Sequence, residues 1–363
     1  MRILWVVYGS LEKLSGGNLY DRLVVEYLRA HGVQVEMLGL TQPPYLLGPL
    51  QALPPRLRWP EGLDAIVVDE LAHPSLFRWA ATRTARPRTA PPRLVTLVHH
   101  LRSCEPPPSA WRALARAMER RLLSCSDAVI TNSRTTAATV QELAGSVPVA
   151  VCPPGCDRLA LPEPAAATAG GEVAAGEGRQ PHRAPVRLLA TGNLIPRKGY
   201  DLLLRMLAGM TDLPWVLRVS GRPVDPRYAG RLQSLVRRGG LDGRVAFAGE
   251  LGTEQLAREY RRAQAFAFPS RYEGYGISLA EAVFAGLPFV AFAGSAVAEA
   301  VQGRGLLAAP GDLPAFGAHL RRLIADAAFR ERQAALSREL APALPRWQDT
   351  GRRFQAALEQ ACG

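Results

Sequence analysis

Short apolar runs alternate with longer amphipathic stretches along the chain, and this alternation constrains the fold more than any other feature. Nearly continuous apolar runs separated by helical segments indicate parallel β-sheets covered by helices on both faces. The runs are RILWVVYG, VQVEMLGL, AIVVDE, RLVTLVHH, DAVITNS and PVAVCPPG in the first half, and VRLLATGN, WVLRVSG, RVAFAGE, AFAFPS, PFVAFAG and GLLAAP in the second. Helical patterns lie between several of them, such as residues 18–31 and 109–124. The sequence therefore predicts an α/β fold.

The length of 363 residues exceeds what one ordinary hydrophobic core holds, so two domains are expected. A tract rich in Ala, Gly, Pro and Glu at residues 159–185 has no apolar period and indicates a flexible linker or a surface insertion. We therefore expect Rossmann-like domains at residues 1–158 and 186–345 that face each other across a cleft. Ligands of such sheets bind beyond the carboxyl ends of the strands, so the loops after the apolar runs are the candidate sites.

The composition, with 48% hydrophobic and 21% charged residues, is typical of a soluble globular protein. No apolar stretch reaches the roughly 18 residues needed to span a bilayer, and the first residues resemble a buried strand more than a signal peptide. We therefore expect a cytoplasmic location. Five cysteines without a CxxC pair indicate reduced thiols more than disulfides or a zinc site.

The net charge of +12 comes almost entirely from arginine, since only Lys13 and Lys198 among the 44 basic residues are lysine. Arginine is a planar fork and lysine a compact charge on a flexible stem, so some sites do not accept the exchange. Each retained lysine therefore marks a position to examine.

Two loops of the first domain hold candidate site residues. Gly16 and Gly17 precede a predicted helix, where they either let the backbone approach an anionic ligand or simply form a tight turn. His99 and His100 follow the strand RLVTLV, where an imidazole can bond a hydroxyl or can serve only in capping or packing.

The second domain opens with LLATGNLIPRKGYDLLLRML, in which Arg197 and Lys198 stand between a glycine turn and a helix. These cations suit the phosphates of a donor, although a solvated surface pair would have the same sequence.

The segment FPSRYEGYGISLAEAVFAGLPFVAF places Glu273 in a loop after a buried strand and Glu281 in the following helix, which Ser278 could cap. Gly274 and Gly276 open the backbone so that helix N–H groups can meet a phosphate. Ionised carboxylates accept strong hydrogen bonds from sugar hydroxyls, and two solvated surface acids are the alternative.

The pattern PSxxEGxGxxxxEAxxxGxPxV resembles the signature of retaining, nucleotide-sugar-dependent glycosyltransferases of the GT-B fold, family 4 (glycosyltransferase group 1). The early GG, the strand ending VHH, DAVITNS, PPGCD and PRKG follow in the family's order. The resemblance extends to residues 346–363, which are similar to a C-terminal helix that packs back on the N-terminal domain. It implies a hexosyltransferase that moves a hexose from a nucleotide diphosphate sugar to an acceptor hydroxyl, with anomeric retention.

The resemblance also implies roles for individual residues. Glu281 would bond the donor ribose and Glu273 the donor sugar. Lys198 would stabilise the diphosphate leaving group, helped by amides around Gly17, Gly276 and Ile277. His99 would lie near sugar and acceptor, and His100 and Arg102 would belong to the acceptor side.

The family pattern has an arginine where this chain has Asn193, and Arg197 is the candidate to supply the missing charge. The chain contains no DxD triplet, and the resemblance implies no cofactor and no metal ion.

Residues 109–124 form a basic amphipathic segment, which predicts either contact with an anionic membrane or a core-facing helix with a solvated back. In a helix over this segment, Trp111, Leu114, Ala115, Met118 and Leu122 share one face, and Arg112, Arg116 and Arg120 form a stripe.

Three other functions remain open. A GT-B sugar-nucleotide epimerase or a phosphorylase would share these motifs, and the pI of about 10.1 raises nucleic-acid binding. Against nucleic acid as a partner, aromatic residues are not interleaved with the basic ones and no nucleic-acid-binding motif occurs.

Overall fold

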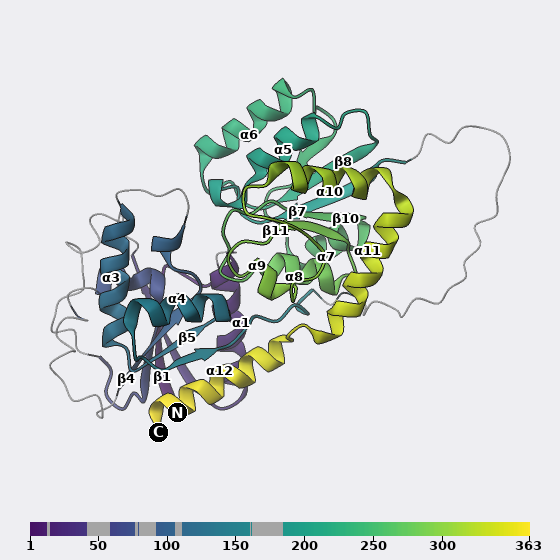
Figure 1. Ribbon diagram of the computed structural model, residues 1–363. Helices are drawn as coiled ribbons and strands as arrows, with labels where there is room; N and C mark the ends of the chain where they lie inside the picture. Colours follow the sequence, from purple (N-terminus) through teal and green to yellow (C-terminus); the bar gives the residue numbers. More distant parts are fainter. Residues whose placement is uncertain are drawn as a thin grey trace. The chain divides into compact units, whose positions relative to one another are not determined.

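The computed structural model describes residues 1–12, 15–41, 59–76, 79, 92–105, 111–159, 161 and 184–363. The chain divides into two compact units (Figure 1). Unit 1 comprises Met1–Gly155 and Pro345–Gly363, and unit 2 comprises Cys156–Leu344. Most of the predicted linker, residues 160 and 162–183, lies outside the described residues.

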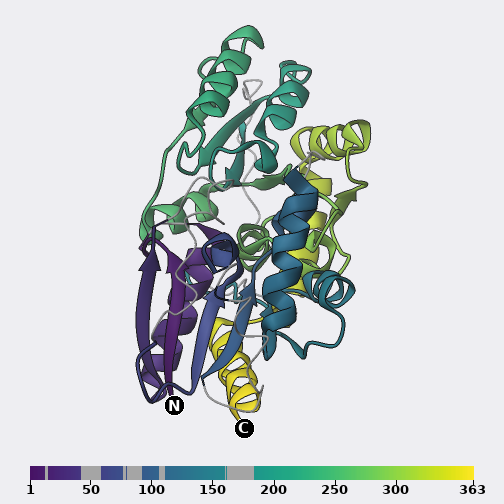
Figure 2. The same cartoon turned by 90° about the vertical axis from the view of Figure 1, so that its left-hand side faces the viewer.

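Unit 1 is built on a six-stranded parallel sheet with the order β2-β1-β3-β4-β5-β6. The strands are β1 (Arg2–Tyr8), β2 (Gln34–Leu40), β3 (Ala65–Asp69), β4 (Arg93–Val98), β5 (Ala128–Thr131) and β6 (Val149–Val151). The helices are α1 (Gly16–Ala30), α3 (Trp111–Cys125), α4 (Arg134–Ala144) and α12 (Trp347–Cys362), with the 3₁₀ turns η2 (Glu70–Ala72) and η3 (Arg102–Cys104). Figure 2 shows this sheet from a second direction, with both chain termini near the same end of unit 1.

Unit 2 contains a second six-stranded parallel sheet, with the order β12-β11-β10-β7-β8-β9. Its strands are β7 (Val186–Thr191), β8 (Trp215–Ser220), β9 (Val245–Phe247), β10 (Ala265–Phe268), β11 (Phe289–Phe292) and β12 (Leu306–Ala308). Its helices are α5 (Tyr200–Ala208), α6 (Pro226–Arg238), α7 (Thr253–Arg262), α8 (Ile277–Phe284), α9 (Val297–Ala300), α10 (Leu313–Ala325) and α11 (Ala327–Leu340). The 3₁₀ turns η4 (Pro196–Lys198) and η5 (Ala341–Ala343) complete the unit.

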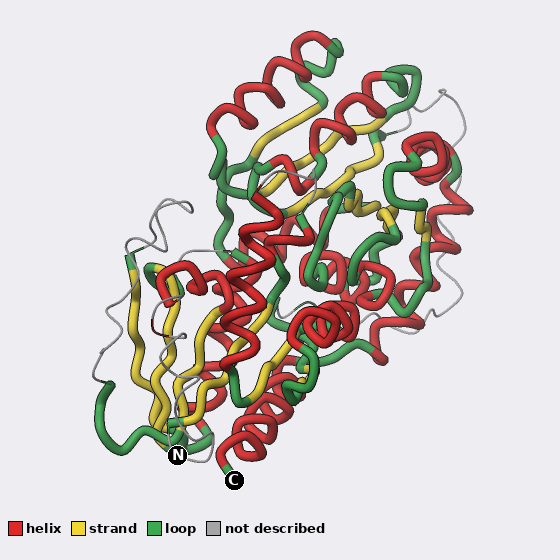
Figure 3. The backbone as a smooth tube through the Cα atoms, turned by 60° about the vertical axis from the view of Figure 1, so that its left-hand side comes forward, coloured by secondary structure: helices red, strands yellow, loops and turns green. Residues whose placement is uncertain are grey.

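The predicted fold class is confirmed, because each of the apolar runs singled out in the sequence contains a strand and both sheets are parallel. Helices cover both faces of each sheet (Figure 3). In β7, Leu188 and Ala190 belong to one hydrophobic cluster and the intervening Leu189 belongs to another. A strand buried on both faces needs apolar residues at successive positions, which explains why these strands lack an in-out alternation.

Each sheet has a position where its strand order reverses direction. In unit 1 the chain moves from β1 to one side through β2 and then to the other side through β3. In unit 2 the corresponding position lies between β7 and β10. At such a position the loops that follow the two strands diverge, which leaves room for a ligand beyond their carboxyl ends.

The chain enters unit 2 slightly earlier than the sequence suggests. The first domain was expected to end at residue 158, but the compact grouping ends it at Gly155. Cys156, Leu159 and Leu161 are buried in the same cluster as residues of β10 and α8, which explains their place in unit 2.

Helix α12 packs against unit 1 through one apolar face. Phe354 and Leu358 are fully buried in a cluster shared with α1 and β1, and the Phe354 ring stacks on Trp5 with 5.4 Å between centroids. Thr350 Oγ1 donates a hydrogen bond of 2.7 Å to the Pro153 carbonyl. Helix α12 therefore contributes to the same hydrophobic core as β1 and α1.

Replacing Phe354 with alanine should destabilise unit 1 by about 3–5 kcal/mol, because it removes a buried aromatic ring and leaves a cavity against Trp5. Urea unfolding followed by tryptophan fluorescence measures the change. Arg352→Ala, on the exposed face of α12, serves as the control and should stay within about 0.5 kcal/mol of the unsubstituted protein. Equal stabilities of the two variants would contradict the packing role of α12.

Candidate active site

Lys198, one of the two lysines in the sequence, follows β7, and its side chain lies in the interior of unit 2. Lys198 ends η4, and its side chain is only 15% exposed. Gly192 has a positive φ of 135°, and a Cβ placed there would lie 3.0 Å from Lys198 Cε and 3.2 Å from the Tyr200 hydroxyl. Tyr200 donates a hydrogen bond of 2.8 Å to the Gly192 carbonyl. Glycine at position 192 therefore leaves space for the lysine to lie along the turn.

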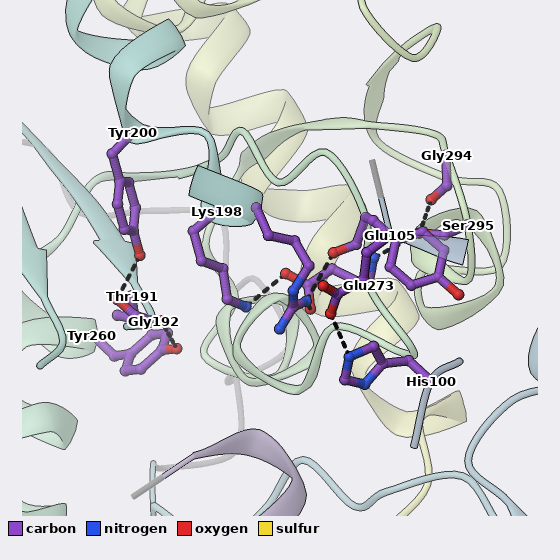
Figure 4. A network of polar contacts seen from close by, with 12 residues as sticks. His100, Glu105, Thr191, Gly192, Lys198, Tyr200, Tyr260, Glu273, Gly294 and Ser295 are labelled. Atoms are coloured by element: carbon purple, nitrogen blue, oxygen red, sulfur yellow. Dashed lines mark hydrogen bonds and ion pairs between the residues drawn. The ribbon is translucent and has the colours of Figure 1, made fainter. Parts of the chain in front are cut away.

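Lys198 forms a short ion pair with Glu273, which follows β10. Lys198 Nζ lies 2.6 Å from Glu273 Oε1 (Figure 4), and Arg197 donates to Glu273 Oε2 at 3.3 Å and to the Tyr272 carbonyl at 2.9 Å. Burial by itself would raise the pKa of Glu273, but the charges of Lys198 and Arg197 outweigh it and lower the pKa to about 2. The carboxylate is therefore ionised at neutral pH.

The loop that bears Glu273 is fixed at several points. The Glu273 N–H donates to Ser295 Oγ at 2.8 Å, and Ser295 has a left-handed backbone with φ of 54°. Arg271 forms two hydrogen bonds of 3.0 Å with the Asp201 carboxylate at the start of α5. These contacts hold the position of Glu273 independently of its own ion pair.

Helix α8 begins directly after this loop, and its cap differs from the one predicted. The N-cap is Gly276, with φ of 107°, whereas Ser278 lies inside the first turn and caps nothing. A left-handed N-cap favours glycine because side chains rarely adopt that conformation. The first helical turn, beginning at Ile277, leaves N–H groups without intrahelical partners, and these groups attract anions. Gly274 lies in the same loop, two residues before the cap.

Glu281 lies in α8, is only 1% exposed, and is not an isolated acceptor. Arg158 donates to both of its oxygens, from Nε to Oε1 at 2.6 Å and from a terminal nitrogen to Oε2 at 3.3 Å. The Tyr260 hydroxyl lies 3.2 Å from Oε2 and 3.2 Å from Thr191 Oγ1, at the end of β7. Burial raises the pKa of Glu281 above its ordinary value, and the opposing effects of Arg158 and Tyr260 offset only part of that rise.

Unit 1 gathers a second set of titratable groups beyond its strand ends. His99 follows β4 and Asp69 ends β3, and His99 Nε2 lies 2.8 Å from Asp21 Oδ1 of α1. Trp5 donates to the other oxygen of Asp21 at 3.3 Å. All three titratable groups are buried. Burial alone would lower the pKa of His99, but the Asp21 carboxylate and, more weakly, Asp69 raise it above its ordinary value.

The ligand atoms of Asp21, Asp69 and His99 lie within 4.8 Å of one another, a spacing that could also hold a metal ion. Burial and the Asp21 charge raise the pKa of Asp69 to about 6. The cluster therefore contains a carboxyl and an imidazole group whose pKa values are both raised, and the expectation of a metal-independent protein stays a prediction.

The other predicted site residues of unit 1 differ in their contacts and exposure. A Cβ at Gly17 would lie 3.1 Å from the His99 ring, whereas one at Gly16 would meet nothing within 4 Å. His100 pairs with Glu105 at 2.7 Å, and Arg102 is the exposed first residue of η3. Gly16 and Gly17 were predicted to precede the helix, but they are the first two residues of α1, and of the two only Gly17 lies against a proposed site residue.

The remaining second-domain candidates lie in the turn after β7. Asn193 follows Gly192 directly, and its carbonyl accepts from the Ile195 N–H at 2.9 Å. Arg197 contacts the Glu273 carboxylate, so the structure brings Arg197, Lys198 and Glu273 into one network. Asn193 adds no side-chain hydrogen bond to that network within the residues that the structure describes.

Sequence reasoning missed Asp21, Arg158 and Tyr260, which contact the predicted site residues directly. Asp21 and Tyr260 lie inside helical patterns that also predict plain surface or core positions. Arg158 is 123 positions from Glu281 in the chain, and one arginine among 42 carries no signal of its own.

The buried face of the basic helix α3 differs from the predicted apolar face, since Leu123 and Cys125 are also buried. Ala115, Met118 and Leu122 are buried, but Leu114 is 39% exposed, so its place on that face was wrong. At 100° per residue, Leu114 lies at the edge of the stripe that Ala115, Met118 and Leu122 form. Arg112 donates to the Ser103 carbonyl at 2.8 Å and so helps to hold η3. The described part of the chain has no helix long and apolar enough to cross a bilayer.

Solved structures with the same fold are glycosyltransferases of the GT-B type. Sucrose-phosphate synthase from Thermosynechococcus elongatus aligns with a TM-score of 0.74 and 21% identity, over 99% of this chain and 98% of that one. Anabaena HepE in complex with UDP-glucose aligns with a TM-score of 0.74 and 16% identity, over 99% and 100% of the two chains. At these identities the likeness establishes the fold.

Family comparisons cover both halves of the chain. Residues 185–326 match the family model of glycosyl transferases group 1, and residues 15–158 match that of glycosyltransferase family 4. The chain therefore belongs to the group 1, family 4 glycosyltransferases of the GT-B fold.

Curated relatives align over shorter stretches. O-antigen chain mannosyltransferase B of Escherichia coli is 34% identical over 162 residues, which cover 43% of this chain and 40% of the relative. A D-inositol 3-phosphate glycosyltransferase of Kineococcus radiotolerans is 32% identical over 237 residues, covering 60% of this chain and 53% of the relative. The chain thus spans about half of the length of these two relatives.

The low pKa of Glu273 predicts how its contribution to stability depends on pH. A carboxyl group whose folded pKa lies below its unfolded value of about 4.3 stabilises the fold above that value and loses the effect as the pH falls. Glu273→Gln should therefore be less stable than the unsubstituted protein above pH 5. The difference should shrink as the pH falls from 5 toward 2, as followed by urea unfolding. A difference that does not depend on pH would contradict the ion pair.

The hydrogen bond between His99 and Asp21 indicates that the Asp21 carboxylate raises the pKa of His99. In Asp21→Asn the carboxylate charge is lost and burial becomes the dominant influence, so the pKa of His99 should fall below its value in the unsubstituted protein. NMR titration of the imidazole nitrogens measures this pKa. The His99 signal is assigned as the one that is missing from the spectrum of His99→Asn. Asp212→Asn, in an exposed ion pair of unit 2, is the control and should leave that pKa unchanged. The same value in Asp21→Asn and in the control would rule out the proposed coupling.

Proposed function

We propose that this protein is a retaining, metal-independent glycosyltransferase that moves a hexose from a nucleotide diphosphate sugar to an acceptor hydroxyl. The observation that carries the proposal is the buried Lys198–Glu273 pair, which lies where the strand order of the second sheet reverses, beside the start of α8. A cation, a carboxylate and unpartnered helix N–H groups are together at the place where ligands of such sheets bind.

The chemistry requires negative charge to be stabilised on the departing nucleotide diphosphate. Lys198 has three N–H donors, and its single hydrogen bond among the described residues is to Glu273, so the remaining donors can reach a phosphate oxygen. The first N–H groups of α8 supply a second positive end. Charges and dipoles that are already in place act most strongly in a site from which water is excluded.

The proposed roles of the two glutamates follow from their ionisation. Glu273, held as a carboxylate by Lys198 and Arg197, would accept hydrogen bonds from the hydroxyls of the donor sugar. Glu281 would accept hydrogen bonds from the ribose. His99, kept in orientation by Asp21, would lie by the sugar and the acceptor.

The transfer step would occur on one face of the sugar. The bond from the anomeric carbon to the diphosphate oxygen breaks, and the acceptor oxygen bonds to that carbon from the same side. The acceptor proton passes to the departing diphosphate oxygen, so that the step is balanced without a nucleophile from the protein.

The comparisons support parts of this proposal. The matched relatives include enzymes named as mannosyltransferases and inositol phosphate glycosyltransferases, and the HepE structure contains UDP-glucose. The acceptor, a cytoplasmic location and a membrane contact through residues 109–124 stay predictions. Residues 109 and 110 lie outside the described residues.

Thermal-shift screening against UDP-, GDP-, ADP- and dTDP-sugars should identify the donor, because a ligand that binds only the folded state raises the melting temperature. With that donor, Lys198→Ala, Glu273→Ala and Glu281→Ala should each lower turnover about 100-fold or more in a folded protein. Arg321→Ala, in an exposed ion pair of α10, is the matched control and should retain the rate.

The same assay separates the alternatives. NMR of the product should show the donor's anomeric configuration, and EDTA should leave the rate unchanged. Epimerised nucleotide sugar without an acceptor would indicate an epimerase, and a need for inorganic phosphate would indicate a phosphorylase. If no nucleotide sugar is bound while nucleic acid binds in a salt-sensitive manner, the glycosyltransferase proposal fails.

A further inference from the structure

Arg158 contacts the carboxylate to which the proposed function assigns the donor ribose. Its guanidinium donates from Nε to Glu281 Oε1 at 2.6 Å and from a terminal nitrogen to Oε2 at 3.3 Å. The side chain of Arg158 is 14% exposed and that of Glu281 is 1% exposed. The pair is therefore largely desolvated, in contrast to the exposed arginine pairs of this chain such as Arg321–Asp212.

The backbone on both sides of Arg158 is held in the core of unit 2. Cys156, Leu159 and Leu161 are buried in the cluster that contains Leu279 and Ala280 of α8. This short stretch comes directly after Gly155, the last residue of unit 1 before the chain enters unit 2. The buried neighbours of Arg158 fix its backbone, so the contact between Arg158 and Glu281 forms when unit 2 folds.

We propose that Arg158 is a positioning residue for donor recognition, which holds the Glu281 carboxylate ionised and in one orientation for the ribose hydroxyls. This inference rests on the proposed function. A buried carboxylate without a partner tends to take up a proton, since burial disfavours its charged form. A planar guanidinium with two parallel hydrogen bonds fixes both the charge and the plane of the carboxylate, which a single-point cation does not.

The contacts leave Glu281 with enough acceptor capacity for a diol. An ionised carboxylate offers about four acceptor positions, two on each oxygen. Arg158 takes one position on each oxygen. Tyr260 has a single hydroxyl proton, and the Ser278 carbonyl at 2.9 Å is a closer acceptor for it than Glu281 Oε2 at 3.2 Å. When Tyr260 donates to Ser278, one position remains on each oxygen of Glu281, which suits two neighbouring hydroxyls.

The groups that control the ionisation of Glu281 are few. Burial raises its pKa above the ordinary value, and the charge and hydrogen bonds of Arg158, followed by the Tyr260 hydroxyl, oppose that rise. Burial also raises the pKa of Tyr260 well above its ordinary value, so the phenol stays protonated and acts as a donor. Removing Arg158 therefore removes the only cation that faces the Glu281 carboxylate within the described residues.

The test measures binding of the nucleoside diphosphate that stabilises the unsubstituted full-length protein, and of its 2′-deoxy counterpart, by calorimetry at pH 6.5 and 9. The variants are Arg158→Met, which keeps length but loses charge, Arg158→Lys, which keeps charge but loses the fork, and Glu281→Gln. Arg321→Met is the control for loss of a surface arginine.

At pH 6.5, Arg158→Met should bind the nucleoside diphosphate about tenfold or more weakly, and its preference over the 2′-deoxy form should largely disappear. Binding should recover in part at pH 9, because a higher pH favours the ionised form of a carboxyl group whose pKa is raised by burial. Glu281→Gln should show the same loss without recovery, and Arg158→Lys should lie between Arg158→Met and the unsubstituted protein. Arg321→Met should bind both nucleotides as the unsubstituted protein does.

The 2′-hydroxyl preference is the readout that a purely structural role of Arg158 would not change. Unchanged affinity and preference in Arg158→Met would overturn the proposal, and so would tighter binding, which would make Arg158 a competitor of the ribose. If Arg158→Met does not fold, values in Arg158→Lys that equal those of the unsubstituted protein would overturn it. Failure of the unsubstituted protein to bind any nucleoside diphosphate would instead refute the proposed function.

Discussion

Lys198 and Glu273 lie 75 positions apart in the chain, and their charged atoms lie 2.6 Å apart in the interior of unit 2. Bringing both groups out of water costs free energy, which the attraction between them offsets only when the geometry is good. The surrounding structure supplies that geometry. Gly192 leaves space for the lysine stem, and Ser295 holds the backbone of the glutamate. The loops after β7 and β10 are therefore organised around one ion pair.

The same principle applies in unit 1 with different chemistry. There the reversal of strand order lies between β1 and β3, and Asp21, Asp69 and His99 gather beyond the strand ends. The mainly apolar strands form the cores, and the proposed site residues lie in the loops that follow the strands or in the helices beside those loops. Parallel sheets permit this division because their strands all end at the same edge.

The alternation of apolar runs was enough to predict the strands, because a strand buried on both faces has few sequence alternatives. The alternation could not predict which strands are neighbours in a sheet, because all of the apolar runs have the same kind of sequence. Predictions of helix caps and of the buried faces of helices were less accurate. Ser278 looked like a helix cap, but the backbone turns at Gly276, and Leu114 lies at the edge of the buried stripe of α3 and is exposed. The Arg158–Glu281 contact joins segments with no local relation, so no spacing rule reveals it.

The proposed roles of Lys198, Glu273 and Glu281 all require the donor to bind beyond β7 and β10 of unit 2. A crystal structure of the protein with a non-hydrolysed nucleotide diphosphate sugar tests this claim most directly. We expect a diphosphate within hydrogen-bond distance of Lys198 Nζ and of the first N–H groups of α8, with the ribose on Glu281. A nucleotide bound elsewhere, with the Lys198–Glu273 pair untouched, would contradict it.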